Sequence, residues 1–96
     1  MAKGYWITFY RSVSNPAALA EYAREAGPAI ETGGGRFMAR GTPAKSYEAG
    51  MNQRTVVIEF DSVQKAIVAY ESDPYQAALK VLEGAVERDV RMLEGV

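Results

Sequence analysis

Glu59 is the side chain whose type and position in this sequence most directly suggest chemistry. It is a carboxylate within the apolar run 56–60, where a charge is costly unless it is paired. Two interpretations are open. Glu59 could form an ion pair with Arg36 or Arg40 on a neighbouring strand, or it could act as a general base or ligand anchor with a perturbed pKa.

The composition narrows the chemistry that any site here could perform. The 96 residues include no histidine and no cysteine. This excludes a Ser-His-Asp triad, a thiolate nucleophile, disulfide bonds, a His-ligated haem and ordinary zinc sites. We therefore expect no metal and no cofactor, and any acid–base step would depend on Glu, Asp, Tyr, Lys or a bound ligand.

The charge and hydropathy of the sequence indicate which partners the protein could have and in which compartment it is expected. The formal net charge is −1 and no run of basic residues occurs, which argues against a nucleic-acid partner. No apolar stretch approaches the roughly 20 residues that span a bilayer. The first residues include no apolar segment typical of an export signal. We expect a cytoplasmic protein that forms a single domain over residues 1–96.

The pattern of residue types predicts the secondary structure. Aromatic and β-branched residues predict four strands, over residues 5–10, 36–40, 53–60 and 88–93. Typical helix starts at Asn15-Pro16, Ser62 and Asp73-Pro74 predict helices over 17–31, after Ser62 and over 75–84. This βαββαβ order is the ferredoxin-like pattern. We predict an α+β fold, with a four-stranded antiparallel sheet and its helices on one face.

Alternation along the strands predicts which side chains share a face of this sheet. Val56, Ile58 and Phe60 are expected beneath the helices. Matching the other strands by apolarity places further residues on that side: Tyr5, Ile7, Phe9, Phe37, Ala39, Val90 and Met92. The second face is then expected to carry Trp6, Thr8, Tyr10, Arg36, Met38, Arg40, Glu59, Arg91 and Leu93.

This second face is too apolar to lie bare in water and too charged for an ordinary core. It suits a homodimer interface, a ligand pocket, or both. The candidate ligand-binding residues are Trp6, Tyr10, Arg36, Arg40, Tyr70 and Tyr75. For Tyr70 and Tyr75, helix packing is the alternative. Because arginines outnumber carboxylates on the face, we expect a small anionic or aromatic ligand.

Several motifs together resemble the uncharacterised family called domain of unknown function 1330. They are Gly4-Tyr5-Trp6, Gly34-Gly35-Arg36-Phe37, Glu48-Ala49-Gly50, the stretch RTVVIEFDSVQKAIVAYESDPY from Arg54 to Tyr75, and the final Leu93-Glu94-Gly95-Val96. The resemblance covers nearly the whole chain. It implies a dimeric α/β barrel, a fold whose members include cofactor-free monooxygenases, muconolactone isomerase-like proteins and haem enzymes such as chlorite dismutase. It implies no established activity, since one fold serves many functions.

The sequence departs from that family's usual pattern at positions that bear on a site. Leu82 stands where members usually have an arginine, Leu19 stands where they usually have a tyrosine, and Asp61 replaces a common proline. If that arginine serves a ligand in relatives, this chain lacks it, and the neighbouring Lys80 and Arg88 are not obvious substitutes.

Three functional hypotheses follow. The first is a homodimer that binds a small anionic or aromatic metabolite in a pocket on the sheet face. The second is a cofactor-independent isomerase or monooxygenase for a small aromatic or enol substrate, with Glu59 or a tyrosine moving the proton. The third is a structural or interaction dimer without a ligand.

Overall fold

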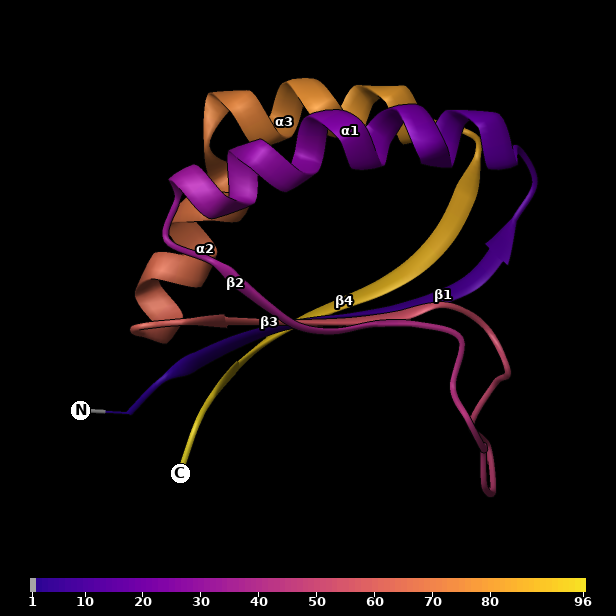
Figure 1. Ribbon diagram of the computed structural model, residues 1–96, viewed down its shortest axis with the longest axis horizontal. Coiled ribbons are helices and arrows are strands. Elements are labelled where there is room, and N and C mark those ends of the chain that lie inside the picture. The colour runs from indigo at the N-terminus through magenta and orange to yellow at the C-terminus, as the bar shows by residue number, and fades with distance from the viewer. Residues whose placement is uncertain (1) are drawn as a thin grey trace.

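The computed structural model describes residues 2–96, in which three α-helices lie on one face of a four-stranded antiparallel sheet (Figure 1). The strands are β1 (Gly4–Val13), β2 (Arg36–Gly41), β3 (Thr55–Phe60) and β4 (Val86–Glu94), in the spatial order β2-β3-β1-β4. The helices are α1 (Pro16–Thr32), α2 (Val63–Glu71) and α3 (Asp73–Leu79), and a 3₁₀ turn covers Lys80–Leu82. The predicted ferredoxin-like fold and the helices on one face are confirmed.

The helix starts follow from short polar side chains and proline. The Asn15 side chain accepts a hydrogen bond from the Ala18 backbone N–H, and the Ser62 hydroxyl accepts one from the Lys65 N–H. Pro16 occupies the first turn of α1, where no N–H is needed. These caps set where α1 and α2 begin, after β1 and β3 respectively.

The predicted face assignment of β1 is wrong. Trp6, Thr8 and Tyr10 lie beneath the helices, and only 1% of the Trp6 surface is exposed. Tyr5, Ile7 and Phe9 therefore point to the open face. Because β1 has aromatic residues in both alternation phases, apolarity does not decide its orientation. Gly4 does: a side chain there would collide with the backbone of Ser62 and Val63 at the start of α2.

The assignment of β2 is corrected by a β-bulge. Phe37 pairs with Ile58 on the helix-covered face, but the register shifts before Ala39, which pairs with Val57. Arg40 then pairs with Val56 and shares its inward face, whereas Arg36 pairs with Glu59. An extra residue in one strand reverses the alternation beyond it, so Arg36 and Arg40 lie on opposite faces.

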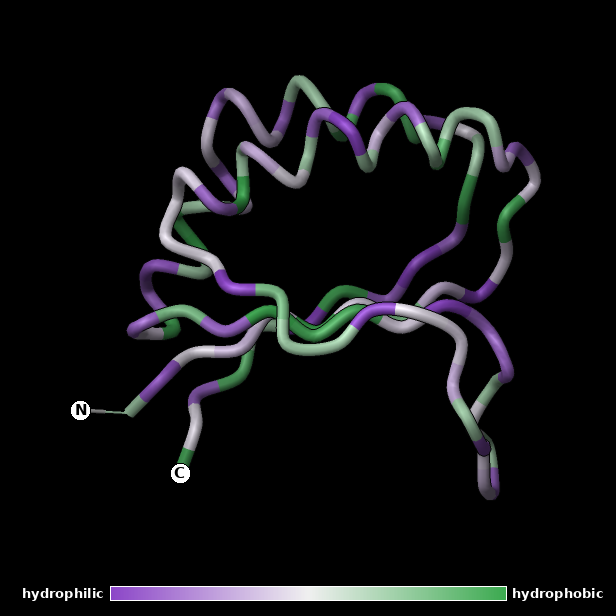
Figure 2. Tube along the Cα trace, viewed as in Figure 1, coloured by the Kyte–Doolittle hydropathy of each residue, from purple (hydrophilic) through white to green (hydrophobic). Residues whose placement is uncertain are grey.

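The open face of the sheet is also apolar. Figure 2 shows apolar residues in succession along the middle of the sheet, and successive residues point to opposite faces. The open face carries Ile7 and Val57 near its centre, with exposed Phe9, Met38 and Leu93 around them. The connection between β2 and β3 projects on this side, away from the helices (Figure 1).

Candidate functional site

A cavity of about 40 Å³ lies between α1 and the helix-covered face of the sheet. Its polar lining consists of Thr8, Tyr10, Tyr22, Arg40, Arg54 and Arg88. Trp6, Ile30 and Ile58 line it as buried apolar side chains, while Arg40 and Ala23 are exposed and mark its mouth. The enclosed volume admits a few waters or a small anionic group.

Three arginines reach this cavity from three different segments. Arg40 comes from β2, where its guanidinium lies 4.6 Å from the centre of the Phe37 ring. Arg54 precedes β3, and its carbonyl accepts a 3.0 Å hydrogen bond from the Tyr10 N–H. Its Nε is buried and makes no hydrogen bond. Within residues 2–96, neither these two arginines nor Arg88 forms an ion pair with a carboxylate.

Arg88 is held by two buried phenols. Its Nη1 donates to the Tyr22 hydroxyl at 3.3 Å, and its Nη2 donates to the Tyr75 hydroxyl at 3.2 Å. The two hydroxyl oxygens are 2.6 Å apart. The guanidinium also lies 5.5 Å from the centre of the Tyr10 ring. Contacts from β1, α1 and α3 therefore fix one cation at the cavity wall.

Burial and the neighbouring charges set the pKa values in this cluster. Burial is the main cause that raises the pKa of the Tyr22 phenol, and the adjacent Tyr75 raises it further. Burial also raises the pKa of Tyr75, against the opposing effect of Arg88. Burial disfavours the charge on Arg88, but the two phenols outweigh it, so the pKa of the guanidinium lies above its ordinary value. The phenols stay protonated and the arginine stays charged at neutral pH.

Thr8 adds a further donor to the same wall. The Trp6 indole N–H donates to the Thr8 hydroxyl oxygen at 2.9 Å, and both side chains are buried. Because that oxygen already accepts, its own hydrogen is free to point into the cavity. The polar wall is thus rich in donors, with no carboxylate among its lining residues.

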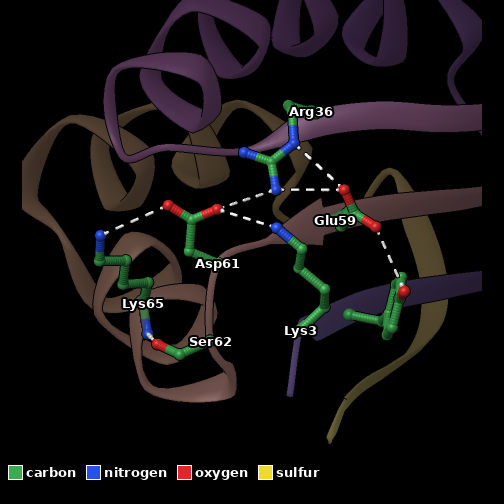
Figure 3. A network of polar contacts seen from close by, with 7 residues as sticks. Lys3, Arg36, Glu59, Asp61, Ser62 and Lys65 are labelled. Carbon is green, nitrogen blue, oxygen red and sulfur yellow. Dashed lines mark hydrogen bonds and ion pairs between the residues drawn. The ribbon is translucent and has the colours of Figure 1, made fainter. Parts of the chain in front are cut away.

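Glu59 and Arg36 lie on the opposite face of the sheet. The Arg36 Nε and Nη2 donate to Glu59 Oε1 at 3.2 and 3.1 Å, and the Tyr5 hydroxyl donates to Glu59 Oε2 at 3.2 Å. Figure 3 shows this pair continuing through Asp61 to Lys3 and Lys65. Of the two interpretations offered for Glu59, the geometry is that of the ion pair with Arg36.

The same network shifts the pKa values of its outer members. The hydrogen bond from Lys3 is the main cause that lowers the pKa of Asp61, and Arg36 adds to it. The hydrogen bond to Glu59 is the main cause that raises the pKa of Arg36. These groups are exposed, so the network is a surface feature that salt will screen.

The structure brings together some of the sequence-predicted site residues and separates others. Trp6, Tyr10 and Arg40 line the cavity, and Tyr75 reaches it through Tyr22. Tyr70 packs on Trp6 and lines a second, open groove of about 460 Å³ beside β4. Leu82 is buried in the core and lines the same groove, as does Arg88.

Sequence reasoning missed Tyr22, Arg54 and Arg88 as site residues. A signal existed for Arg88, because it alternates with Val90 and Met92, which were expected beneath the helices. Tyr22 stands on the same helical stripe as Ala26 and Ile30. Nothing in the pattern marks Arg54, whose position depends on how the β2–β3 connection returns to the sheet.

Within residues 2–96, no cluster of three or more potential metal ligands is found. None of the helices there has both the length and the apolar character needed to cross a membrane.

Glu59→Gln should have a small effect on stability. Glutamine keeps the shape and can still accept from Tyr5, while the pair with Arg36, whose own side chain is exposed, contributes little in water. We expect the melting temperature to fall by no more than about 5 °C at low salt, and by less at high salt. Calorimetry at two salt concentrations checks this, with Tyr47→Phe in the exposed loop as the control. A larger fall that is insensitive to salt would contradict a surface role for the pair.

Fold and motifs together define a small ferredoxin-like protein with a cationic cavity. The chain belongs to the family "Domain of unknown function (DUF1330)", whose model matches residues 3–96. A comparison with curated proteins found no match.

Several solved structures have the same fold but low sequence identity to this chain. A protein of unknown function from Rhodopseudomonas palustris is 19% identical, with a TM-score of 0.74 over 99% of this chain and 83% of that one. A dimeric ferredoxin-like protein of unknown function from Thermobifida fusca YX is 16% identical, with a TM-score of 0.67 over 97% and 91%. A protein from Nitrosomonas europaea, described provisionally as an antibiotic biosynthesis monooxygenase, is 17% identical, with a TM-score of 0.60 over 100% and 99%. These likenesses establish the fold alone.

Proposed function

We propose that the protein binds a small anionic ligand in the cavity between α1 and the sheet. The observation that carries this proposal is the buried Arg54 Nε without a hydrogen-bond partner. Buried donors are nearly always satisfied, and Arg54 is one of the residues that line the cavity, so its orphaned Nε indicates a missing acceptor beside this space. Arg40 and Arg88 line the same space without a carboxylate, so that acceptor should be an anion.

The size of the cavity limits what enters it. About 40 Å³ holds a carboxylate or a similar oxyanion, but not a whole aromatic ring. The body of a larger ligand would therefore lie at the mouth, beside Leu19, Phe37 and Arg40. Half-buried Phe37 and the guanidinium stacked on it offer a flat surface suited to a planar body.

Thermal shift at low salt tests the proposal with acetate, benzoate, neutral benzyl alcohol and cationic benzylamine. We expect benzoate to raise the melting temperature by about 5–10 °C at ten times its Kd, because only the folded state binds it. Arg54→Met should weaken benzoate binding by about tenfold or more, since it removes a charged donor. Arg24→Met, on the exposed side of α1, removes the same charge and should bind benzoate normally. Equal effects of the two variants, or no shift with any anion, would refute the cavity as the anion site.

A cofactor-independent isomerase or monooxygenase is the second candidate. Tyr22, a phenol among the residues that line the cavity, favours it, and one similar structure carries a provisional monooxygenase description. Glu59 is not carried into this candidate, because it is bound to Arg36 and Tyr5 on the other face of the sheet. Turnover of a planar enol or phenol that is lost in Tyr22→Phe would support an enzyme over a binding protein.

We also propose that the protein is a cytoplasmic homodimer whose open sheet faces pack together. Exposed Phe9, Met38 and Leu93 surround half-buried Ile7 and Val57 on that face, and such an area is costly to leave in water. A small domain gains useful apolar burial by pairing. Sedimentation at micromolar concentration should give twice the 10.5 kDa chain mass. A chain that stays monomeric at this concentration would contradict the proposal.

A further inference from the structure

The deep end of the cavity presents an O–H group whose direction follows from counting hydrogens. Tyr22 and Tyr75 have one hydroxyl hydrogen each, and their oxygens are 2.6 Å apart, so one hydrogen lies between them. Both oxygens also accept from Arg88. One hydroxyl hydrogen is therefore not used inside the cluster.

Burial decides which tyrosine has the unused hydrogen. Tyr75 has no exposed surface and does not line the cavity, so an unused hydrogen there would be an unsatisfied buried donor. Tyr22 lines the cavity and can direct its hydrogen into it. The lower-energy arrangement has Tyr75 donating to Tyr22, and Tyr22 donating into the cavity.

This arrangement places several donors around one small volume. The Tyr22 O–H, the Thr8 O–H and the Arg54 N–H are available, and Arg88 supports Tyr22 from behind. Donors of this kind stabilise a charged oxygen more than its protonated form. We propose that the cavity binds the oxyanion of a planar phenol or enol, and that binding lowers the pKa of that ligand. This inference rests on the proposed function.

The proton balance of this event is simple. A ligand that is protonated in solution loses its O–H proton to the solvent as its oxygen enters the cavity, and no bond to the protein forms. The charged and titratable groups around that oxygen are Tyr10 from β1, Tyr22 from α1, Arg40 from β2, Arg54 before β3 and Arg88 from β4, with Tyr75 from α3 behind. Burial keeps the Tyr22 pKa high, so this phenol keeps its hydrogen and remains a donor.

The experiment uses 4-nitrophenol, whose anion absorbs visible light and whose neutral form does not. At a pH well below its solution pKa, addition of the protein should produce the nitrophenolate absorbance. The midpoint of the spectroscopic titration should fall by at least about one pH unit on binding. Tyr22→Phe should abolish at least half of that shift, because it removes the hydroxyl that donates into the cavity, together with that hydroxyl's contacts to Tyr75 and Arg88. Tyr5→Phe removes one hydrogen-bonded phenol on the other face and should leave the shift unchanged.

The outcomes separate this inference from the proposed function. If benzoate binds but 4-nitrophenol binds with an unshifted midpoint, the oxyanion inference is wrong and the anion site stands. If neither ligand binds, both proposals are wrong. Should Tyr22→Phe not fold, Thr8→Val replaces it, and an unchanged midpoint shift in a folded Thr8→Val protein would also overturn the inference, since the hydroxyl donors would then be irrelevant.

Discussion

Replacing Trp6 with alanine is expected to lower the free energy of unfolding by about 3–5 kcal/mol. The indole is buried beneath the helices and packs at 4.8 Å from the Tyr75 ring and 5.3 Å from the Tyr70 ring, measured between ring centres. Its removal leaves a cavity and also deprives Thr8 of a hydrogen-bond donor. A loss of this size is a large share of the stability of a small domain.

Chemical denaturation followed by far-UV circular dichroism measures this effect, because Trp6 is the chain's single tryptophan and its fluorescence is lost in the variant. Tyr47→Ala is the matched control: Tyr47 is 73% exposed in the β2–β3 connection and should change stability by less than about 0.5 kcal/mol. If Trp6→Ala leaves the free energy of unfolding unchanged but abolishes self-association, Trp6 lies in an interface and this prediction is wrong.

Phe9→Asp is expected to convert the proposed dimer into a monomer. Phe9 lies in β1, one of the two inner strands, is 40% exposed on the open face, and has the Arg91 guanidinium 5.7 Å from its ring centre. A short carboxylate there would be desolvated on pairing, and its side chain is too short to reach the solvent. We expect the dimer to dissociate at least a hundredfold more readily, measured by sedimentation equilibrium.

Two comparison variants make this experiment decisive. Val68→Asp places the same charge on α2, in the helix layer, where Val68 is 66% exposed, and should leave the dimer intact. Leu93→Asp tests a second position on the open face, in case Phe9→Asp disturbs the monomer. Circular dichroism must show that each variant is folded. A dimer that survives both open-face changes would exclude this face as the interface.

The element order could be read from the sequence because its signals are local. Asn15-Pro16 and Ser62 place the helix starts through bonds to backbone groups three residues away. The βαββαβ order then limits the sheet to a few topologies. Absence of histidine and cysteine also restricts the chemistry without any knowledge of the fold.

The candidate site was predicted in part. An arginine-rich, aromatic surface was expected, and Trp6, Tyr10 and Arg40 lie together as lining residues of one cavity. Its anionic ligand stays a prediction. The predicted face of the sheet was wrong. Both alternation phases of β1 contain aromatic residues, so its orientation depends instead on the close approach of Gly4 to α2. Glu59 was separated from Arg40 by a bulge that no local pattern indicates.

By itself, the sequence determined the order of the elements, their caps and an excess of cationic donors without histidine or cysteine. Only the tertiary structure decided which face those donors occupy. Tyr22, Tyr75 and Arg88 stand on α1, α3 and β4, and their side chains meet only when the helix layer is in place over the sheet. Such contacts depend on strand phase and helix packing across the whole chain, which residue spacing within one element does not specify.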